Sequence, residues 1–137
     1  MTTRPGVLVV ASTLSALLAC ATAADAQTAR TGTLMREKLL HSQRILAALT
    51  SSDYPLLQRE TQALTRVTQN PIWTETMTTV FRPHADAFTK ALADLSAAAE
   101  RRDYDSAGAS YGAMTAACLN CHKHVMNSRI AEATRHR

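Results

Sequence analysis

The stretch 103-DYDSAGASYGAMTAACLNCHKHV-125 decides how the chain folds, because it joins a helix start, a long apolar repeat and a cluster of cysteines and histidines. Asp103 is suited to cap a helix N-terminus. Apolar positions then recur at steps of three and four, at Ala107, Tyr111, Met114, Cys118 and Val125. This spacing places them on one helical face, which His122 shares because it follows Cys118 by four residues. The sequence therefore predicts a last helix whose inner face presents a cysteine and a histidine.

The composition of the chain favours a single all-α domain. Of its 137 residues, 46% are hydrophobic and 19% are charged, while aromatic residues make up only 4% and glycine and proline number four each. Helix breakers are scarce and strand formers are not clustered. The net charge of +4 comes from scattered cations rather than from a basic run with interleaved aromatic residues. Nucleic-acid binding is therefore not indicated, and the charge is suited to attract an acidic protein partner.

Three further helices are predicted before the last one. The first covers roughly residues 33–50, with Thr33 as its cap and one apolar face formed by Met35, Leu39, Ser42, Leu46 and Leu49. The second starts after Asp53, with Pro55 in its first turn. Residues 70–81 read as a packed connection with one helical turn, and Pro83 starts a helix that ends near Arg102. Four amphipathic helices with short links predict an antiparallel four-helix bundle.

The N-terminal segment has the pattern of a secretory signal peptide. Arg4 precedes an apolar run from Val7 to Leu18, and Ala24-Asp25-Ala26 forms a cleavage site. We therefore expect residues 1–26 to be removed and residues 27–137 to form an exported domain without a membrane span, because the apolar run is shorter than the roughly 20 residues that a span needs. Cys20 in "LLAC" is also compatible with lipid attachment, a minor alternative.

The "CLNCH" motif at residues 118–122 admits three chemistries. A disulfide between cysteines three residues apart on a helix is strained and leaves His122 unexplained. Zinc would need Cys121, His122 and His124 to converge, although neighbouring residues on a helix point about 100° apart. Haem fits better, because C-x-x-C-H is the attachment sequence of c-type haem: two thiols bond the porphyrin and the histidine binds iron. Export agrees with this interpretation.

The motif near the end of a fourth helix resembles the class II cytochromes c, the cytochrome c′ group and its low-spin relatives. The resemblance covers essentially residues 27–137 and implies a bundle with one covalent haem c on the last helix. It makes Cys118 and Cys121 the thioether anchors and His122 the proximal iron ligand. One position departs from the pattern, because members with an open distal face usually carry an arginine where this chain has Met126.

A methionine in the first helix decides which function the resemblance implies. "MREKL" at residues 35–39 resembles the start of this helix in low-spin members, where a methionine binds iron. With His122 and Met35 as axial ligands, the protein is a periplasmic one-electron carrier and not an enzyme. If Met35 only fills the core, the protein is a five-coordinate cytochrome c′-like protein that binds nitric oxide or carbon monoxide. Met77 and His41 are weaker candidates for the sixth position.

The surroundings of the motif suggest how the protein meets its partners. Several cations lie at or beyond the end of the last helix: Lys123, His124, Arg129, Arg135, His136 and Arg137. They either form a solvated helix end or dock an acidic redox protein. The remaining histidines, His41 and His84 among them, are expected to be solvent-exposed. The resemblance also implies a homodimer through the first two helices, although the sequence shows no decisive patch for it.

Overall fold

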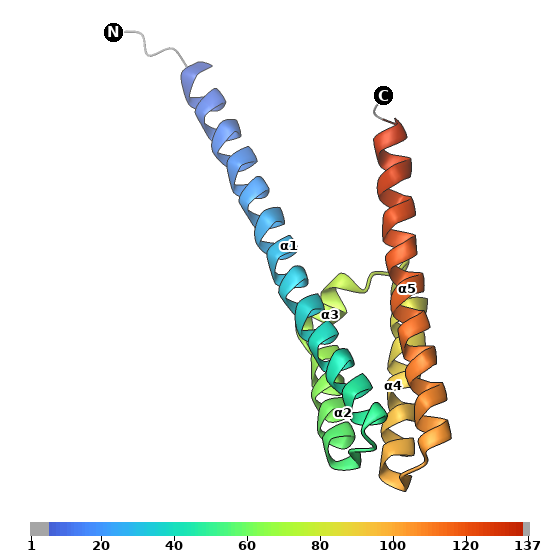
Figure 1. Cartoon of the computed structure of the whole chain (residues 1–137). Coiled ribbons are helices and arrows are strands. Elements are labelled where there is room, and N and C mark those ends of the chain that lie inside the picture. Colours follow the sequence, from blue (N-terminus) through green and yellow to red (C-terminus); the bar gives the residue numbers. More distant parts are fainter. Residues whose placement is uncertain (1–5, 136–137) are drawn as a thin grey trace.

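The computed structural model describes residues 6–135, with side chains described from residue 25 onward. Four long helices, α1 (Gly6–Thr50), α2 (Tyr54–Thr68), α4 (Arg82–Arg101) and α5 (Tyr104–Arg135), run antiparallel to their chain neighbours, and the short α3 (Pro71–Thr76) joins α2 to α4. The predicted all-α four-helix bundle is confirmed. Figure 1 also shows that the N-terminal part of α1 and the C-terminal part of α5 extend beyond the other helices and diverge from each other. No helix in the described part of the chain has the length and hydropathy of a membrane span.

The two aspartates that were predicted to precede helices, Asp53 and Asp103, cap the N-termini of α2 and α5. Asp53 accepts a hydrogen bond from the Leu56 amide at 2.9 Å and so begins α2. Asp103 accepts one from the Ser106 amide at 3.1 Å and so begins α5. Before each aspartate, one residue adopts the left-handed conformation, Ser52 and Arg102 with φ of 55° each. The two helical hairpins of the bundle are therefore built by the same turn.

The helix start predicted at Thr33 is wrong. α1 continues through this position from Gly6, and the Thr33 hydroxyl donates to the Ala29 carbonyl oxygen at 3.1 Å, as in a helix interior. The segment before Thr33 contains no proline after Pro5, so nothing in the local sequence ends the helix there. The predicted signal peptide therefore forms the first part of α1 as far as the described residues reach, and residues 1–5 lie outside them.

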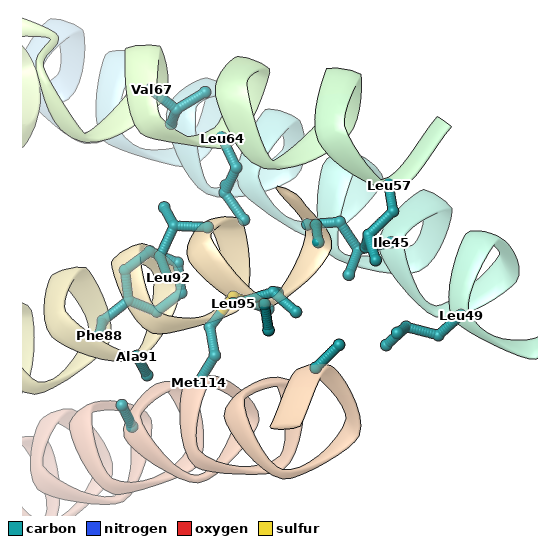
Figure 2. Close-up of a cluster of buried hydrophobic side chains, with 14 of the residues drawn as sticks. Ile45, Leu49, Leu57, Leu64, Val67, Phe88, Ala91, Leu92, Leu95 and Met114 are labelled. Atoms are coloured by element: carbon teal, nitrogen blue, oxygen red, sulfur yellow. The ribbon is translucent and has the colours of Figure 1, made fainter. Parts of the chain in front are cut away.

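The bundle core forms between α1, α2 and α4, with α5 closing one side (Figure 2). Its fully buried side chains include Ile45 of α1, Leu57 and Leu64 of α2, Phe88, Leu92 and Leu95 of α4, and Met114 of α5. Each such side chain contributes roughly 1.5–3 kcal/mol of hydrophobic free energy when it leaves water. The predicted face of α5 is buried at Ala107 and Met114, whereas His122, predicted on the same inner face, is exposed.

The face of α1 that packs into the core differs from the predicted one. Leu34, Lys38, Ile45, Ala48 and Leu49 are buried, whereas Leu39 and Leu46 are exposed by 58% and 47%. The predicted stripe did not include Lys38, although the long aliphatic stem of a lysine can pack as an apolar side chain. α1 thus has two neighbouring apolar faces, of which one fills the core and the other, with Met35 and Leu39, lines a cavity.

The connection between α2 and α4 is packed, as predicted. Asn70 caps α3 by accepting a hydrogen bond from the Ile72 amide at 3.0 Å. Trp73 is buried, and its ring centroid lies 5.9 Å from that of Phe88. α3 is tied to α1 by a 3.3 Å hydrogen bond between the hydroxyls of Thr31 and Thr76. These contacts hold α3 across the open end of the core, next to the C-x-x-C-H motif.

Candidate functional site

A cavity of about 430 Å³ separates α1 from α5 beside the motif. It exists because α5 packs closely on α4 and α1 packs on α2, while α1 and α5 touch little. The α1 wall includes Met35, Lys38, Leu39 and Ser42, and the α5 wall includes Tyr111, Met114, Cys118, Leu119 and His122. Most of these lining groups are apolar, which is the environment that a porphyrin ring prefers.

A hydrogen bond between α1 and α5 fixes which residues face one another across this cavity. The Tyr111 hydroxyl donates to the Ser42 carbonyl oxygen at 3.2 Å. Met35 lies seven residues before Ser42, and Cys118 lies seven residues after Tyr111. Because the two helices are antiparallel, both residues lie about 10.5 Å from this hydrogen bond in the same direction along the bundle. The part of α1 that carries Met35 therefore lies opposite the C-x-x-C-H motif.

A second, smaller cavity of about 20 Å³ lies on the inner side of the motif. Met35, Cys118 and His122 line it as well as the larger cavity, and Cys121 and Met77 join them there. Met77 is buried, with only 5% of its surface exposed. Because it lines the same small cavity as the motif, it lies closer to the motif than its position in an irregular connection suggested. All the residues predicted for the site, Met35, Cys118, Cys121 and His122, thus line one continuous region of the bundle.

The two thiols of the motif are half-buried and unpaired. Burial raises the pKa of Cys118 above its ordinary value, and the positive charge of Lys38 opposes that rise. The pKa of Cys121 is raised for the same reason. Both sulfurs are therefore protonated at neutral pH in the chain before any cofactor is attached.

Lys38 is the residue of this region that the sequence interpretation missed. Its side chain is 9% exposed, and its ammonium lies 3.5 Å from the Phe88 ring centroid and 4.3 Å from that of Trp73. The sequence contained a signal for this position, because Lys38 follows Leu34 by four residues and Met35 by three and so shares a helical face with them.

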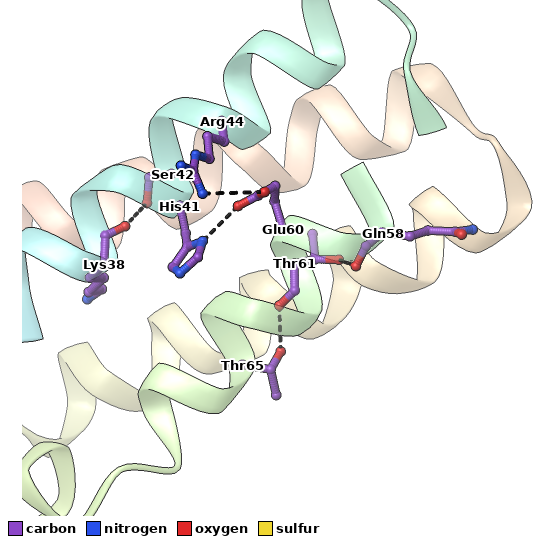
Figure 3. A network of polar contacts seen from close by, with 8 residues as sticks. All are labelled: Lys38, His41, Ser42, Arg44, Gln58, Glu60, Thr61 and Thr65. Carbon is purple, nitrogen blue, oxygen red and sulfur yellow. Dashed lines mark hydrogen bonds and ion pairs between the residues drawn. The ribbon is translucent and has the colours of Figure 1, made fainter. Parts of the chain in front are cut away.

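Three histidines predicted to be solvent-exposed are half-buried instead. The His41 Nδ1 atom lies 2.7 Å from Glu60 Oε2, and Arg44 approaches the other carboxylate oxygen at 3.8 Å (Figure 3). His41 therefore joins α1 to α2 and does not line either cavity. The rings of His84 and His124 lie 5.7 Å apart, because α4 and α5 pack closely at this point. His136 lies outside the described residues.

The donor set fits a covalently bound haem. It supplies two thiols one helical turn apart, an imidazole next to the second thiol, and a thioether on the facing helix. Among the described side chains, no three His, Cys, Asp or Glu residues are grouped to hold a metal ion, which a zinc site would require. Thioether bonds to a porphyrin need no such convergence of ligands.

Comparison with known proteins agrees with this interpretation. The family model described as cytochrome c′ matches residues 22–124. A solved ferrous variant of cytochrome c′ from Alcaligenes xylosoxidans with bound nitric oxide is 20% identical, with 72% of this chain and 91% of that chain covered and a TM-score of 0.61. Cytochrome c′ from Rubrivivax gelatinosus is 18% identical, with 67% and 88% covered and a TM-score of 0.54. No curated protein matches the chain.

Proposed function

Because the chain belongs to the cytochrome c′ family, whose proteins carry one covalent haem c, we propose that it is a periplasmic carrier of single electrons. Cys118 and Cys121 hold the haem through thioether bonds, and His122 binds iron from α5. Met35 binds iron from α1. Residues 1–26 serve as the signal peptide that exports the chain, and lipid attachment at Cys20 is the alternative processing.

The observation that carries this proposal is the position of Met35. It lies on the helix opposite His122, and both residues line the two cavities beside the motif. A thioether is a soft and neutral ligand, so a methionine opposite a histidine stabilises ferrous iron and raises the reduction potential. With both axial positions held by side chains, the site exchanges electrons and leaves no position for a substrate.

The role of each side chain follows from where the helix holds it. Cys118 and Cys121 fix the haem edge to α5, so the proximal His122 cannot drift from the iron. The haem itself supplies the one-electron exchange. Met35, on a different helix, responds to any movement of α1 relative to α5. The hydrogen bond from Tyr111 to Ser42 limits that movement.

A visible spectrum of the haem-loaded protein tests the proposal. We expect a low-spin spectrum with a weak sulfur-to-iron band in the oxidised form. Met35→Ala should abolish that band, because the only proposed sulfur ligand is then missing. Met77→Ala is the matched control, since Met77 is a buried methionine beside the same small cavity, and it should keep the band. A band that survives Met35→Ala and disappears in Met77→Ala would make Met77, the residue that follows α3, the sulfur ligand.

The second candidate function is binding of nitric oxide or carbon monoxide at a five-coordinate haem. It is favoured by the solved cytochromes c′ that share this fold, several of which are nitric oxide complexes. In that case Met35 only fills the cavity wall. A parent protein that is already high-spin and binds carbon monoxide rapidly would establish this function and reject the electron-carrier proposal.

Two surfaces support proposals about partners. Lys123 and Arg129 are exposed on α5 beyond the motif, where they are placed to attract an acidic redox protein.

On α1, Leu40 and Leu46 are exposed by 44% and 47%, which favours association of two copies through α1 and α2. Sedimentation of the haem-loaded protein, with Leu46→Glu as the variant, tests the homodimer. A parent protein that stays monomeric would reject it.

A further inference from the structure

Lys38 is a buried cation with an unusual environment. It lies on the core face of α1, between Leu34 and Ile45, rather than on a solvated face. Its ammonium rests on the rings of Phe88 and Trp73, and Figure 3 shows the side chain extending from α1. None of the hydrogen bonds or ion pairs among the described residues involves this ammonium. Its partners among the described residues are therefore the two aromatic rings, and no carboxylate pairs with this buried charge.

The amine belongs to the region that receives the haem. Lys38 lines both cavities together with Met35, Cys118 and His122. Its charge acts on the pKa of both Cys118 and Cys121, so it lies near the two sulfurs. A haem held by these two thiols would carry its propionates on the porphyrin edge away from them, so the propionates would be poorly placed to pair with this amine. The iron of such a haem would be the nearer group.

The geometry points to Lys38 as a reserve ligand of the haem iron, which binds at the sixth position when Met35 is absent. This inference rests on the proposed haem attachment and on His122 as the proximal ligand. Side chains on a helix tilt toward its N-terminus, so Lys38 extends toward the level of Met35, three residues earlier. For the bond to form, Nζ releases one proton to water and donates its lone pair to iron.

The electrostatics of the pocket favour the neutral amine. Burial lowers the pKa of Lys38 below its ordinary value, and attraction to Cys118 and Cys121 partly offsets this effect. At neutral pH both thiols are protonated and carry no charge, and the thioether sulfurs formed by haem attachment are neutral as well. Burial therefore acts on Lys38 both before and after attachment, and it makes the lone pair of this amine more available than that of an exposed lysine.

The test compares three haem-loaded variants. Met35→Ala should lose the sulfur-to-iron band and remain low-spin through the amine. Met35→Ala combined with Lys38→Leu, which keeps an aliphatic side chain in the core, should be high-spin. If the amine holds the iron in nine of ten molecules, the double variant should bind carbon monoxide about tenfold faster than Met35→Ala. Met35→Ala combined with Lys90→Leu is the control, because Lys90 is exposed on α4, and it should behave as Met35→Ala.

The outcomes separate the inference from the proposed function. If Met35→Ala and the Lys38→Leu double variant have the same spectrum and the same rate, the inference is wrong while Met35 ligation stands. If the parent shows no sulfur-to-iron band, the proposed function fails first. Should the double variant not fold, Met35→Ala grown with ¹⁵N-lysine provides a second measurement. Electron-nuclear double resonance should then detect ¹⁵N coupling to the low-spin iron, and its absence would overturn the inference.

Discussion

The hydrogen bond between Tyr111 and Ser42 gives the sharpest prediction, because it joins the two helices that carry the proposed axial ligands. Tyr111→Phe removes the hydroxyl that donates to the Ser42 carbonyl oxygen at 3.2 Å and keeps the ring that lines the cavity. No cavity is created, so only the hydrogen bond is lost. Such a bond contributes about 1 kcal/mol to the free energy of unfolding. For a domain of this size, the loss lowers the melting temperature by about 5 °C.

The same variant should loosen Met35. A free energy of about 1 kcal/mol changes an equilibrium about fivefold. If the bond holds α1 toward α5, the fraction of molecules in which Met35 has left the iron rises by at most that factor. Carbon monoxide should therefore bind the reduced variant up to about fivefold faster than it binds the parent. Flash photolysis measures the rate, and calorimetry of the haem-loaded protein measures the melting temperature.

Tyr104→Phe is the matched control for Tyr111→Phe. Tyr104 lies on the same helix but is 53% exposed, and its hydroxyl bonds no other described residue. This variant should change neither the melting temperature nor the rate. If Tyr111→Phe is also indistinguishable from the parent in both measurements, the bond does not set the spacing between α1 and α5, and the argument that positions Met35 through it is refuted.

Two further predictions concern the cofactor and its partner. Haem should stay with the parent chain in acidified organic solvent and be extracted from a Cys118→Ala/Cys121→Ala variant, and free extraction from the parent would exclude thioether bonds. Lys123→Glu with Arg129→Glu should slow electron exchange with an acidic partner at low salt and leave the spectrum unchanged. Lys90→Glu, on α4, should have little effect, and a rate that ignores both salt and the α5 changes would remove the docking surface.

Histidines and the first helix show where interpretation of the sequence failed. His41 was expected in solvent because it lies off the predicted apolar stripe, yet it binds Glu60, which lies 19 residues later on α2. The predicted core face of α1 left out Lys38, although the rings of Trp73 and Phe88 cover this side chain. In each case the deciding partner lies on another helix, and a periodicity within one segment contains no information about that partner.

The sequence by itself determined the features that depend on neighbours in the chain. Asp53 and Asp103 cap helices through amides three residues away, and the C-x-x-C-H motif places its thiols one turn apart on any regular helix. Only the tertiary structure decided that Met35 lies across a cavity from that motif and that Lys38 lies beside it. Those positions follow from how α1 packs against α2 and stands away from α5, which depends on side-chain contacts between segments far apart in the sequence.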